Sequence, residues 1–322
     1  MQSAKPGGEF AGQTVVVVGL GPLSGVAAAR ALAARGARVI LNDARDAVAL
    51  TEQVDVLKAD AFSDAYEISF GSPPTALAHR ANLMVVSPGV PYDLPMLRAA
   101  RDAGAPTVGE LEFAWRLGSA RVVAVTGTKG KSTTTTLVGA MLKGAPEAGA
   151  VAVGGNIGLP LSEITPRLTR DDTLVAEVSS FQLESIVDFR PDIAVVLNIS
   201  PDHLDRHGTM DAYVAAKIRV VENQTADDLL VINADDDATE AFARATSARV
   251  VAFSLQRPVP FGAFLEGSSI VWAEDGARTT VCRADRLGVP GRHNLANALA
   301  ATAVARAMGV SPDRIEEALA GF

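Results

Sequence analysis

The sequence predicts an α/β protein in which a Rossmann-like domain is followed by a P-loop ATPase-like domain with a mostly parallel sheet. Three observations support this fold class. A β-branched run, Thr14 to Val18, ends at the glycine-rich segment GLGPLSG and is followed by an alanine-rich helical pattern. A second apolar run stops at TGTKGKST, Thr126 to Thr133, before another helical pattern. Further strand-like runs alternate with helical segments, which is typical of parallel sheets.

Length and composition limit the classes of protein that the sequence can encode. Its 322 residues are enough for about two domains. The formal net charge of −8, with no basic run of even five residues, argues against a nucleic-acid or anionic-membrane surface. The single cysteine, Cys282, excludes an intramolecular disulfide. No stretch has the apolar length of a signal peptide or a membrane span. We therefore expect a cytoplasmic protein without membrane insertion, and we expect it to be monomeric.

The first domain, predicted to span residues 1–118, opens with a nucleotide-binding pattern. Its segments are a strand at Thr14 to Val18, the turn Gly19 to Gly25, a helix at Val26 to Arg35 and a strand at Ala37 to Leu41 that ends before Asn42 and Asp43. Glycines permit close approach of a diphosphate to the helix start, and Asp43 can accept a hydrogen bond from a nucleotide. A purely structural turn in a doubly wound sheet is the alternative.

The rest of this domain supplies one more candidate loop. The strand Leu83 to Val86 runs into SPGVP, Ser87 to Pro91, at the carboxyl edge where such sheets bind ligands. Helices are predicted over Pro95 to Ala103 and Leu111 to Leu117. The boundary is placed between Gly118 and Ser119, so that the second domain spans residues 119–322.

The second domain opens with a phosphate-binding loop. The N–H groups of Gly127 to Lys131 can point into one concavity, where the dipole of the following helix, Lys131 to Lys143, favours negative charge. Lys131 can reach a terminal phosphate, and the hydroxyl of Ser132 or Thr133 can bind Mg²⁺. Val125 stands where the general P-loop pattern has a glycine, so the match is to the tighter TGTxGKST variant. An ordinary glycine turn is the alternative.

Later strands of the second domain end in polar residues. Thr173 to Val178 carries the acid Glu177 near its end, a costly place for a carboxylate unless it is paired or bound to a cation. Ile193 to Leu197 ends before Asn198. The remaining predicted elements are a helix at Asp211 to Asn223, a strand at Leu229 to Ile232, a β-rich part at Val250 to Val281, and helices at Asn294 to Met308 and Pro312 to Ala320.

Six separated motifs together resemble the Mur ligase family. They are TGTKGKST at Thr126 to Thr133, GGNIGLP at Gly154 to Pro160, EVSSFQLE at Glu177 to Glu184, NISPDHLDRH at Asn198 to His207, YVAAKIRV at Tyr213 to Val220, and GRHNLANALAA at Gly291 to Ala301. The strings GNIGLP and SSFQLE point to the members that add D-glutamate. The resemblance implies an ATP-dependent ligase of peptidoglycan precursor synthesis that joins D-glutamate to UDP-N-acetylmuramoyl-L-alanine through an acyl phosphate.

The resemblance also implies roles for individual residues. Those of catalysis are Lys131, Glu177, His203 and Lys217, the last as a carbamylated lysine. Those of ATP binding are Gly127, Thr128, Lys129, Gly130, Lys131, Ser132, Thr133, Asn294 and Asn297. Two Mg²⁺ ions are expected at Ser132, Thr133, Glu177, His203 and Lys217. The residues that the resemblance implies for binding the UDP part of the substrate are Gly21, Pro22, Leu23, Ser24, Asp43, Ala44, Arg45, Pro88, Gly89, Asn156, Ser179 and His203.

Three features depart from the family pattern. GLGPLSG is one residue longer than the usual GLGxxG, so the amides that meet the diphosphate are not fixed, and Pro22 has none to offer. Lys129 stands where many members have asparagine. The family also has a third domain, expected after Phe322, that binds D-glutamate, and we expect the 322 residues alone to be inactive without it.

Several residues also allow a purely structural interpretation, and the chain as a whole allows other functions. By composition alone, Lys217 is interpreted as a solvated helix lysine, and the alternative interpretation of Asn294 is a helix cap without a further role. His79 is expected to be structural. The chain can also belong to a sister ligase that adds another amino acid, or to a non-catalytic nucleotide-binding or NAD-binding protein built on Gly19, Gly21 and Asp43.

Overall fold

The computed structural model describes residues 8–71, 75–288 and 290–322, which divide into two compact units. Unit 1 extends to Gly118 and also includes Leu159–Arg167 and Glu184–Asp188, whereas unit 2 contains the rest of the chain from Ser119. The two later segments join unit 1 because buried glutamates of one helix accept their backbone N–H groups, Glu110 from Ser162 at 2.9 Å and Glu112 from Val187 at 2.8 Å. A boundary drawn at one point of the sequence misses both segments.

Unit 1 is built on a five-stranded parallel sheet in the order β3-β2-β1-β4-β5. The strands are β1 Thr14–Val18, β2 Arg38–Asp43, β3 Tyr66–Phe70, β4 Leu83–Val86 and β5 Thr107–Gly109. The helices are α1 Ser24–Ala33, α2 Thr51–Lys58, α3 Pro95–Asp102, α4 Glu110–Arg116 and α6 Leu161–Ile164. Side chains from α1, α2 and α4 cover one face of the sheet, and those of α3 cover the other. Burial on both faces explains the continuous apolar run of β1.

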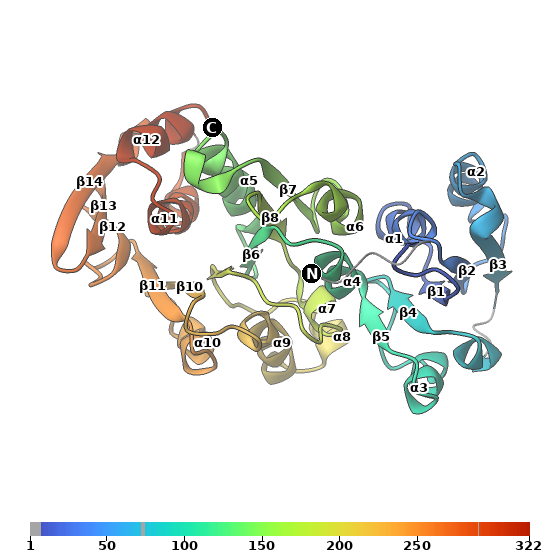
Figure 1. Cartoon of the computed structure of the whole chain (residues 1–322). Coiled ribbons are helices and arrows are strands. Elements are labelled where there is room, and N and C mark those ends of the chain that lie inside the picture. The colour runs from blue at the N-terminus through green and yellow to red at the C-terminus, as the bar shows by residue number, and fades with distance from the viewer. Residues whose placement is uncertain (1–7, 72–74, 289) are drawn as a thin grey trace. The chain divides into compact units, whose positions relative to one another are not determined.

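Unit 2 contains a nine-stranded sheet in the order β14-β13-β12-β11-β10-β9-β6-β8-β7. Pairing is parallel from β7 to β12, and β13 and β14 continue the sheet antiparallel at one end, drawn in orange in Figure 1. The strands are β6 Arg121–Thr126, β7 Val151–Gly155, β8 Thr173–Glu177, β9 Ile193–Val196, β10 Leu229–Asn233, β11 Arg249–Ser254, β12 Gly262–Glu266, β13 Ser269–Glu274 and β14 Ala277–Arg283.

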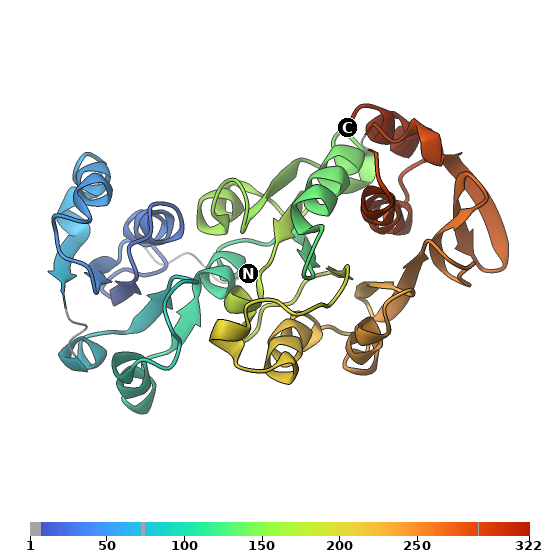
Figure 2. The same cartoon turned by 180° about the vertical axis from the view of Figure 1, so that it is seen from behind.

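The two longest helices of unit 2 within the described ranges are α5 Lys131–Leu142 and α11 Arg292–Ala307. They lie side by side both in Figure 1 and in the view from behind in Figure 2. The others are α7 Ser180–Leu183, α8 Leu204–His207, α9 Met210–Ile218, α10 Glu240–Arg244 and α12 Pro312–Ala320. The predicted helix over residues 211–223 is wrong in its second half, because the α-helix ends at Ile218 and continues only as the 3₁₀ turn Arg219–Val221.

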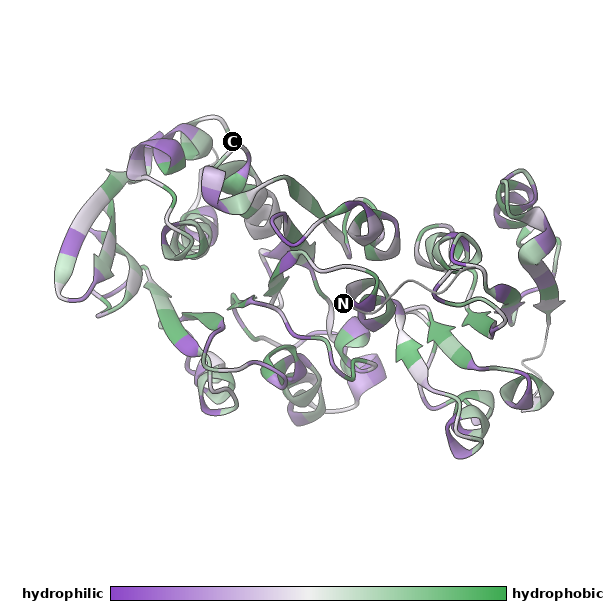
Figure 3. Cartoon of the chain, in the orientation of Figure 1, coloured by the Kyte–Doolittle hydropathy of each residue, from purple (hydrophilic) through white to green (hydrophobic). Residues whose placement is uncertain are grey.

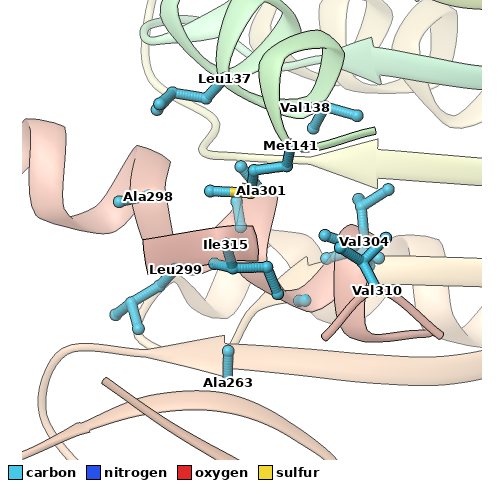
Figure 4. Close-up of a cluster of buried hydrophobic side chains, with 14 of the residues drawn as sticks. Leu137, Val138, Met141, Ala263, Ala298, Leu299, Ala301, Val304, Val310 and Ile315 are labelled. Carbon is cyan, nitrogen blue, oxygen red and sulfur yellow. The ribbon is translucent and has the colours of Figure 1, made fainter. Parts of the chain in front are cut away.

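The core of unit 2 fixes the helix that begins at the phosphate loop. Leu137, Val138 and Met141 of α5 pack with the alanine-rich face of α11 and with Ile315 of α12 (Figure 4). The small side chains of α11 allow its backbone to approach α5 closely. In Figure 3 strands such as β4, β5 and β11 are mainly apolar, as expected where a sheet is buried between helices, whereas β14 is mostly white and purple and is largely exposed. None of the helices in the described ranges is long and apolar enough to cross a membrane.

Candidate nucleotide and metal site

The phosphate loop connects the buried strand β6 to α5 and requires glycine at two positions. Gly127 and Gly130 have φ values of 143° and 86°, in the region that side chains other than glycine rarely adopt. A Cβ atom on Gly130 would lie 2.3 Å from Oδ1 of Asn297, so that this glycine also makes room for a side chain of α11. The loop conformation thus depends on both glycines, and α5 begins directly after it at Lys131.

Asn198 anchors the loop from the end of the neighbouring strand β9. Its side chain accepts a hydrogen bond from Lys129 N at 2.8 Å and donates one to Lys129 O at 2.9 Å. Its carbonyl oxygen accepts from Thr128 N at 2.9 Å. The prediction that all N–H groups from Gly127 to Lys131 form one cradle is therefore wrong for Thr128 and Lys129, whose N–H groups are bonded to Asn198. The Thr128 hydroxyl also has a hydrogen-bond partner within the chain, because its oxygen lies 3.0 Å from the hydroxyl oxygen of Tyr213.

Lys131 folds back over the loop. Its Nζ donates to the carbonyl oxygens of Gly127 at 3.1 Å and Thr128 at 2.9 Å. Burial lowers the pKa of Lys131, and the carboxylates of Glu177 and Asp202 oppose that shift. An anionic group beside the loop would stabilise this partly desolvated ammonium.

Glu177 lies at the end of β8, next to the start of α5, and its carboxylate accepts hydrogen bonds only from uncharged side chains among the described residues. Ser132 Oγ donates to Oε2 at 2.7 Å, and Asn156 Nδ2 donates to Oε1 at 2.8 Å. The residue is buried and forms no ion pair within the described residues, although its charge acts on Lys131 and Lys217. Thr133 makes no side-chain hydrogen bond within the described part of the chain. The structure therefore brings together the predicted pair of Ser132 and Glu177, with oxygen donors of the type that Mg²⁺ prefers.

Lys217 is buried, so its interpretation as a solvated helix lysine is wrong. It is 2% exposed, and its Nζ donates to the carbonyl oxygen of Gly127 at 2.9 Å and to Thr126 Oγ1 at 3.4 Å. The ring of Tyr213 lies 5.0 Å from Nζ. Burial, followed by repulsion from Lys131, lowers the pKa of Lys217 to about 7. A large fraction of its amine is therefore uncharged at neutral pH.

His203 has an unusual backbone conformation directly before α8. Its φ is 51°, and besides His203 only Asp275 has a positive φ among the non-glycine residues that the structure describes. Such a conformation is costly and is often maintained at functional sites. The ring packs against Phe181 at 4.9 Å between centroids, and half of the side chain is exposed. His207 lies in the same aromatic cluster and is 3.0 Å from Ser180 Oγ. No group of three or more His, Cys, Asp or Glu suited to a metal ion occurs in the described ranges.

A cavity of about 320 Å³ lies beside the loop. Its lining residues are Lys129, Gly130, Leu197, Asn198, Asn233, Phe253, His293, Ala296 and Asn297. Asn297 is 6% exposed, and its amide hydrogen-bonds to no other residue in the described ranges, so it offers donors and an acceptor to the cavity. Asn294 does not line this cavity. Its amide donates to the carbonyl of Pro290 at 2.8 Å, and Gly291 rather than Asn294 precedes the first residue of α11.

The glycine-rich turn of unit 1 is organised by Asp43. This buried carboxylate accepts hydrogen bonds from Leu20 N at 2.8 Å and Arg45 N at 2.9 Å, and from the Arg45 guanidinium. Burial alone raises the pKa of Asp43, but the hydrogen bonds from Arg45 and Leu20 outweigh it and hold the pKa below its usual range. Both oxygens thus already have partners within the chain, which differs from the expected role as an acceptor for a nucleotide.

The other substrate residues predicted in unit 1 lie near the carboxyl ends of parallel strands. Gly21, Pro22 and Leu23 follow β1 and precede α1, which begins at Ser24. Ala44 and Arg45 follow β2, and Pro88 and Gly89 follow β4 beyond Ser87, whose hydroxyl donates to Gly19 O at 2.6 Å. Asn156, Ser179 and His203 belong to unit 2.

Comparison with known proteins identifies the family. Residues 125–305 match the Mur ligase middle domain, and residues 13–109 match the Mur ligase MurD-like, N-terminal domain. The chain belongs to the Mur ligase family. Among its relatives, the UDP-N-acetylmuramoylalanine--D-glutamate ligases of Pelotomaculum thermopropionicum and Acidobacterium capsulatum are each 44% identical to it. The matches cover 98% of this chain and 68% and 67% of those proteins, so it spans about two thirds of their length.

Solved structures of Mur ligases share the fold. The chain resembles a UDP-N-acetylmuramate:L-alanyl-gamma-D-glutamyl-meso-diaminopimelate ligase from Neisseria meningitides with a TM-score of 0.62 and 20% identity, over 96% of this chain and 98% of that one. It resembles the UDP-N-acetylmuramate-alanine ligase MurC from Thermotoga maritima with a TM-score of 0.55 and 24% identity, over 96% and 68%. These likenesses support the predicted α/β class for this Mur ligase family member.

The sequence assigns no role to several residues that surround the phosphate loop. Asn198 stands after a predicted strand and opens the motif NISPDHLDRH, and Tyr213 belongs to the motif YVAAKIRV, but neither pattern indicates a contact with the loop. The cavity residues Phe253 and Asn233 come from strands distant in sequence from the phosphate loop. The polar residue at the end of β9 was a usable signal for Asn198, since the carboxyl ends of neighbouring parallel strands meet at one sheet edge.

Proposed function

We propose that the chain carries the ATP and nucleotide-substrate sites of a ligase that joins D-glutamate to UDP-N-acetylmuramoyl-L-alanine. The relatives that it matches over nearly its whole length are named for this reaction. One observation carries the proposal: Lys131, Lys217 and the Ser132–Glu177 pair converge on the phosphate loop. Lys131 supplies a cation, and Ser132 and Glu177 supply oxygen donors, as phosphoryl transfer requires.

The proposed reaction has two steps. A carboxylate oxygen of the UDP substrate attacks the γ-phosphorus of ATP, forming an acyl phosphate and releasing ADP. The amine of D-glutamate then attacks the acyl carbon and forms the amide bond, the bond between that carbon and the phosphate oxygen breaks with its electron pair on phosphate, and the nitrogen releases one proton to solvent. The role of Lys131 is to bind the transferring phosphoryl group, while the loop holds the nucleotide in position. We propose that D-glutamate binds to a further domain of the kind found in the family.

Mg²⁺ fits the donor set at the loop. We propose that Glu177 and the hydroxyl of Ser132 or Thr133 hold one ion, and that His203 and Lys217 contribute to a second. Bound Mg²⁺ would neutralise the charge of the phosphates. Glu177 supplies the carboxylate oxygen that a hard cation prefers, whereas the imidazole of His203 is a less usual ligand for this ion.

Carbamylation would adapt Lys217 to this role. A bare ammonium beside a divalent cation is repelled, whereas a carbamate is negatively charged and supplies two oxygen atoms. The uncharged amine adds to CO₂, a C–N bond forms, and one proton is released to solvent. The lowered pKa of Lys217, about 7, favours the amine form that this addition needs.

The cavity beside Gly130 is the proposed site of the nucleotide base. It adjoins the phosphate loop, and the amide of Asn297, which forms no hydrogen bond with another described residue, offers donors and an acceptor to a heterocycle. Asn294, whose amide is bonded to Pro290, contributes to ATP binding only through the position of the helix start. We propose that the glycine-rich turn of unit 1 binds the UDP part of the substrate, that the protein is cytoplasmic and that it is monomeric.

Ligand-induced thermal stabilisation tests the proposed function. If the proposed function is correct, UDP-N-acetylmuramoyl-L-alanine and Mg-ATP each raise the Tm of the 322-residue chain, because a ligand that binds the folded state stabilises it. Stabilisation by NAD, without stabilisation by either of these ligands, would favour a dinucleotide-binding protein and contradict the proposed ligase function. Product formation is then measured with D-glutamate present, both for the chain alone and with the unmatched third of a relative added in trans.

A further inference from the structure

Lys129 is a cation of the phosphate loop that the proposed reaction does not use. It is exposed, and its side chain forms no ion pair with any residue in the described ranges. Lys129 also lines the cavity beside the loop, together with Gly130 and Asn297. Lys131, in contrast, turns toward the carbonyls of Gly127 and Thr128, where it interacts with Glu177. The two lysines of the loop therefore have different surroundings, because Lys129 lines the cavity and Lys131 contacts the loop carbonyls.

The backbone of Lys129 is held from both sides. Asn198 accepts its N–H at 2.8 Å and donates to its carbonyl oxygen at 2.9 Å, while Gly130 follows in a left-handed conformation. This pair of bonds uses the polar groups of the Lys129 backbone. Only its side chain is left to contact a ligand, and the clamp limits the directions in which that side chain can extend.

The positions of the two ends of a bound nucleotide decide which phosphate Lys129 can reach. Under the proposed function, the base occupies the cavity and the terminal phosphate lies near Lys131, Ser132 and Glu177. A residue that lines the cavity and belongs to the loop lies between these ends. The phosphate attached to the ribose also lies between the base and the terminal phosphate, and therefore near Lys129. The ammonium of a lysine forms a strong, charge-assisted hydrogen bond with a phosphate oxygen.

We propose that Lys129 binds the ribose-linked phosphate of the nucleotide and thereby contributes to its affinity, with Asn198 as the residue that positions it. This inference rests on the proposed function and adds a nucleotide contact to it. Because Lys129 is exposed, its contribution is limited by solvent and falls as salt rises. It does not depend on the identity of the base, and it is absent for a nucleoside without phosphate.

Calorimetry with Lys129→Met tests the proposal. At about 50 mM salt we expect ADP to bind roughly three- to tenfold more weakly than to the parent chain, with adenosine unchanged. The difference for ADP should shrink at about 0.5 M salt, and Lys129→Arg should retain most of the affinity. Lys143→Met, at the other end of α5, is the matched control and should leave both affinities unchanged. Thermal unfolding checks that each variant folds.

Asn198→Asp provides a second measurement. It removes the donor to Lys129 O, and we expect the loss of ADP affinity on adding Lys129→Met to be smaller in this background than in the parent. Equal loss of ADP and adenosine binding in Lys129→Met would overturn the inference, as would unchanged ADP binding. If the parent chain bound neither ATP nor ADP, the proposed function itself would be contradicted.

Discussion

Lys131 and Lys217 both donate a hydrogen bond to the carbonyl oxygen of Gly127, at 3.1 Å and 2.9 Å. The two amines come from the helix that follows the phosphate loop and from α9, and each has its pKa lowered mainly by burial. Repulsion from Lys131 contributes to the shift of Lys217. The convergence of the two amines on one carbonyl places both of them at the loop, where a bound phosphate group would stabilise their charged forms.

Replacing Lys131 should separate ATP binding from binding of the UDP substrate. We expect Lys131→Ala to lower the affinity for Mg-ATP by at least about 100-fold, since hydrogen bonds between charged groups are strong where solvent is partly excluded. Binding of UDP-N-acetylmuramoyl-L-alanine should stay within a few-fold, because we place its UDP part in unit 1. Calorimetry with each ligand gives the result. Loss of both affinities together would indicate misfolding or a single shared site.

Glu177→Gln should weaken the dependence on Mg²⁺ while the fold is retained. The glutamine oxygen can accept from Asn156, and its NH₂ group can donate to Ser132 Oγ in place of the bond that Ser132 now donates. The negative charge for the ion is lost. The midpoint of the Mg²⁺ titration, followed by ATP binding, should rise about tenfold or more, with the Tm within a few degrees of the parent. A titration curve identical to the parent's would argue against the metal role.

Asp43→Asn should destabilise unit 1 at neutral pH but not in acid. The folded pKa of Asp43 lies below its unfolded value of 3.8, so its ionisation stabilises the folded state above that value, and this contribution is lost as the pH falls through the folded pKa. We expect the variant to lose about 1–2 kcal/mol at pH 7. The urea midpoints of the two proteins should draw together as the pH falls below 3.8, and a difference that stays constant through the folded pKa would show that ionisation of Asp43 does not matter.

The sequence predicts the central strands β1 and β4 of unit 1 well, because each is a short, buried apolar run that stops at a turn. β1 and β4 have the predicted bounds, and so does α12. β5, with three residues, and β7, with two glycines at its end, were missed because neither shows a long enough apolar pattern. The extension of β2 to Asp43 follows from pairing with β3, Asp43 opposite Phe70, which no local pattern reveals.

The candidate site shows the same division between local and distant information. The loop glycines, Lys131 and Glu177 could be identified because each stands at a strand end or helix start that the sequence marks. The burial of Lys217 could not, because its neighbours in space, Thr126 and Gly127, lie about 90 residues away in the chain. Asp43 looked like a ligand for a nucleotide, yet its partner Arg45 is two residues away, and such short-range competition is difficult to weigh from sequence.

Carbamylation of Lys217 should depend on pH. With a pKa of about 7, roughly a tenth of its amine is uncharged at pH 6 and roughly nine tenths at pH 8. A ¹³C carbamate signal from labelled bicarbonate should therefore be weak at pH 6, strong at pH 8 and absent from Lys217→Ala. Lys143→Ala, which removes an exposed lysine of unit 2, should keep the signal.

The activity of Lys217→Ala provides the functional counterpart. An ammonium about 4 Å from Mg²⁺ would be repelled by roughly 8 kcal/mol at an effective dielectric constant near 20, twice the value for two unit charges, whereas a carbamate would attract the ion. In the ligase assay we expect Lys217→Ala to retain under about 1% of the parent activity, because both the negative charge and its oxygen atoms are lost. Formate or acetate should partly restore turnover by occupying the space of the carbamate, and the same salts should not raise the activity of Lys131→Ala. A carbamate signal absent at pH 8, combined with no rescue by either carboxylate, would show that Lys217 acts as an amine that neutralises phosphate beside Gly127.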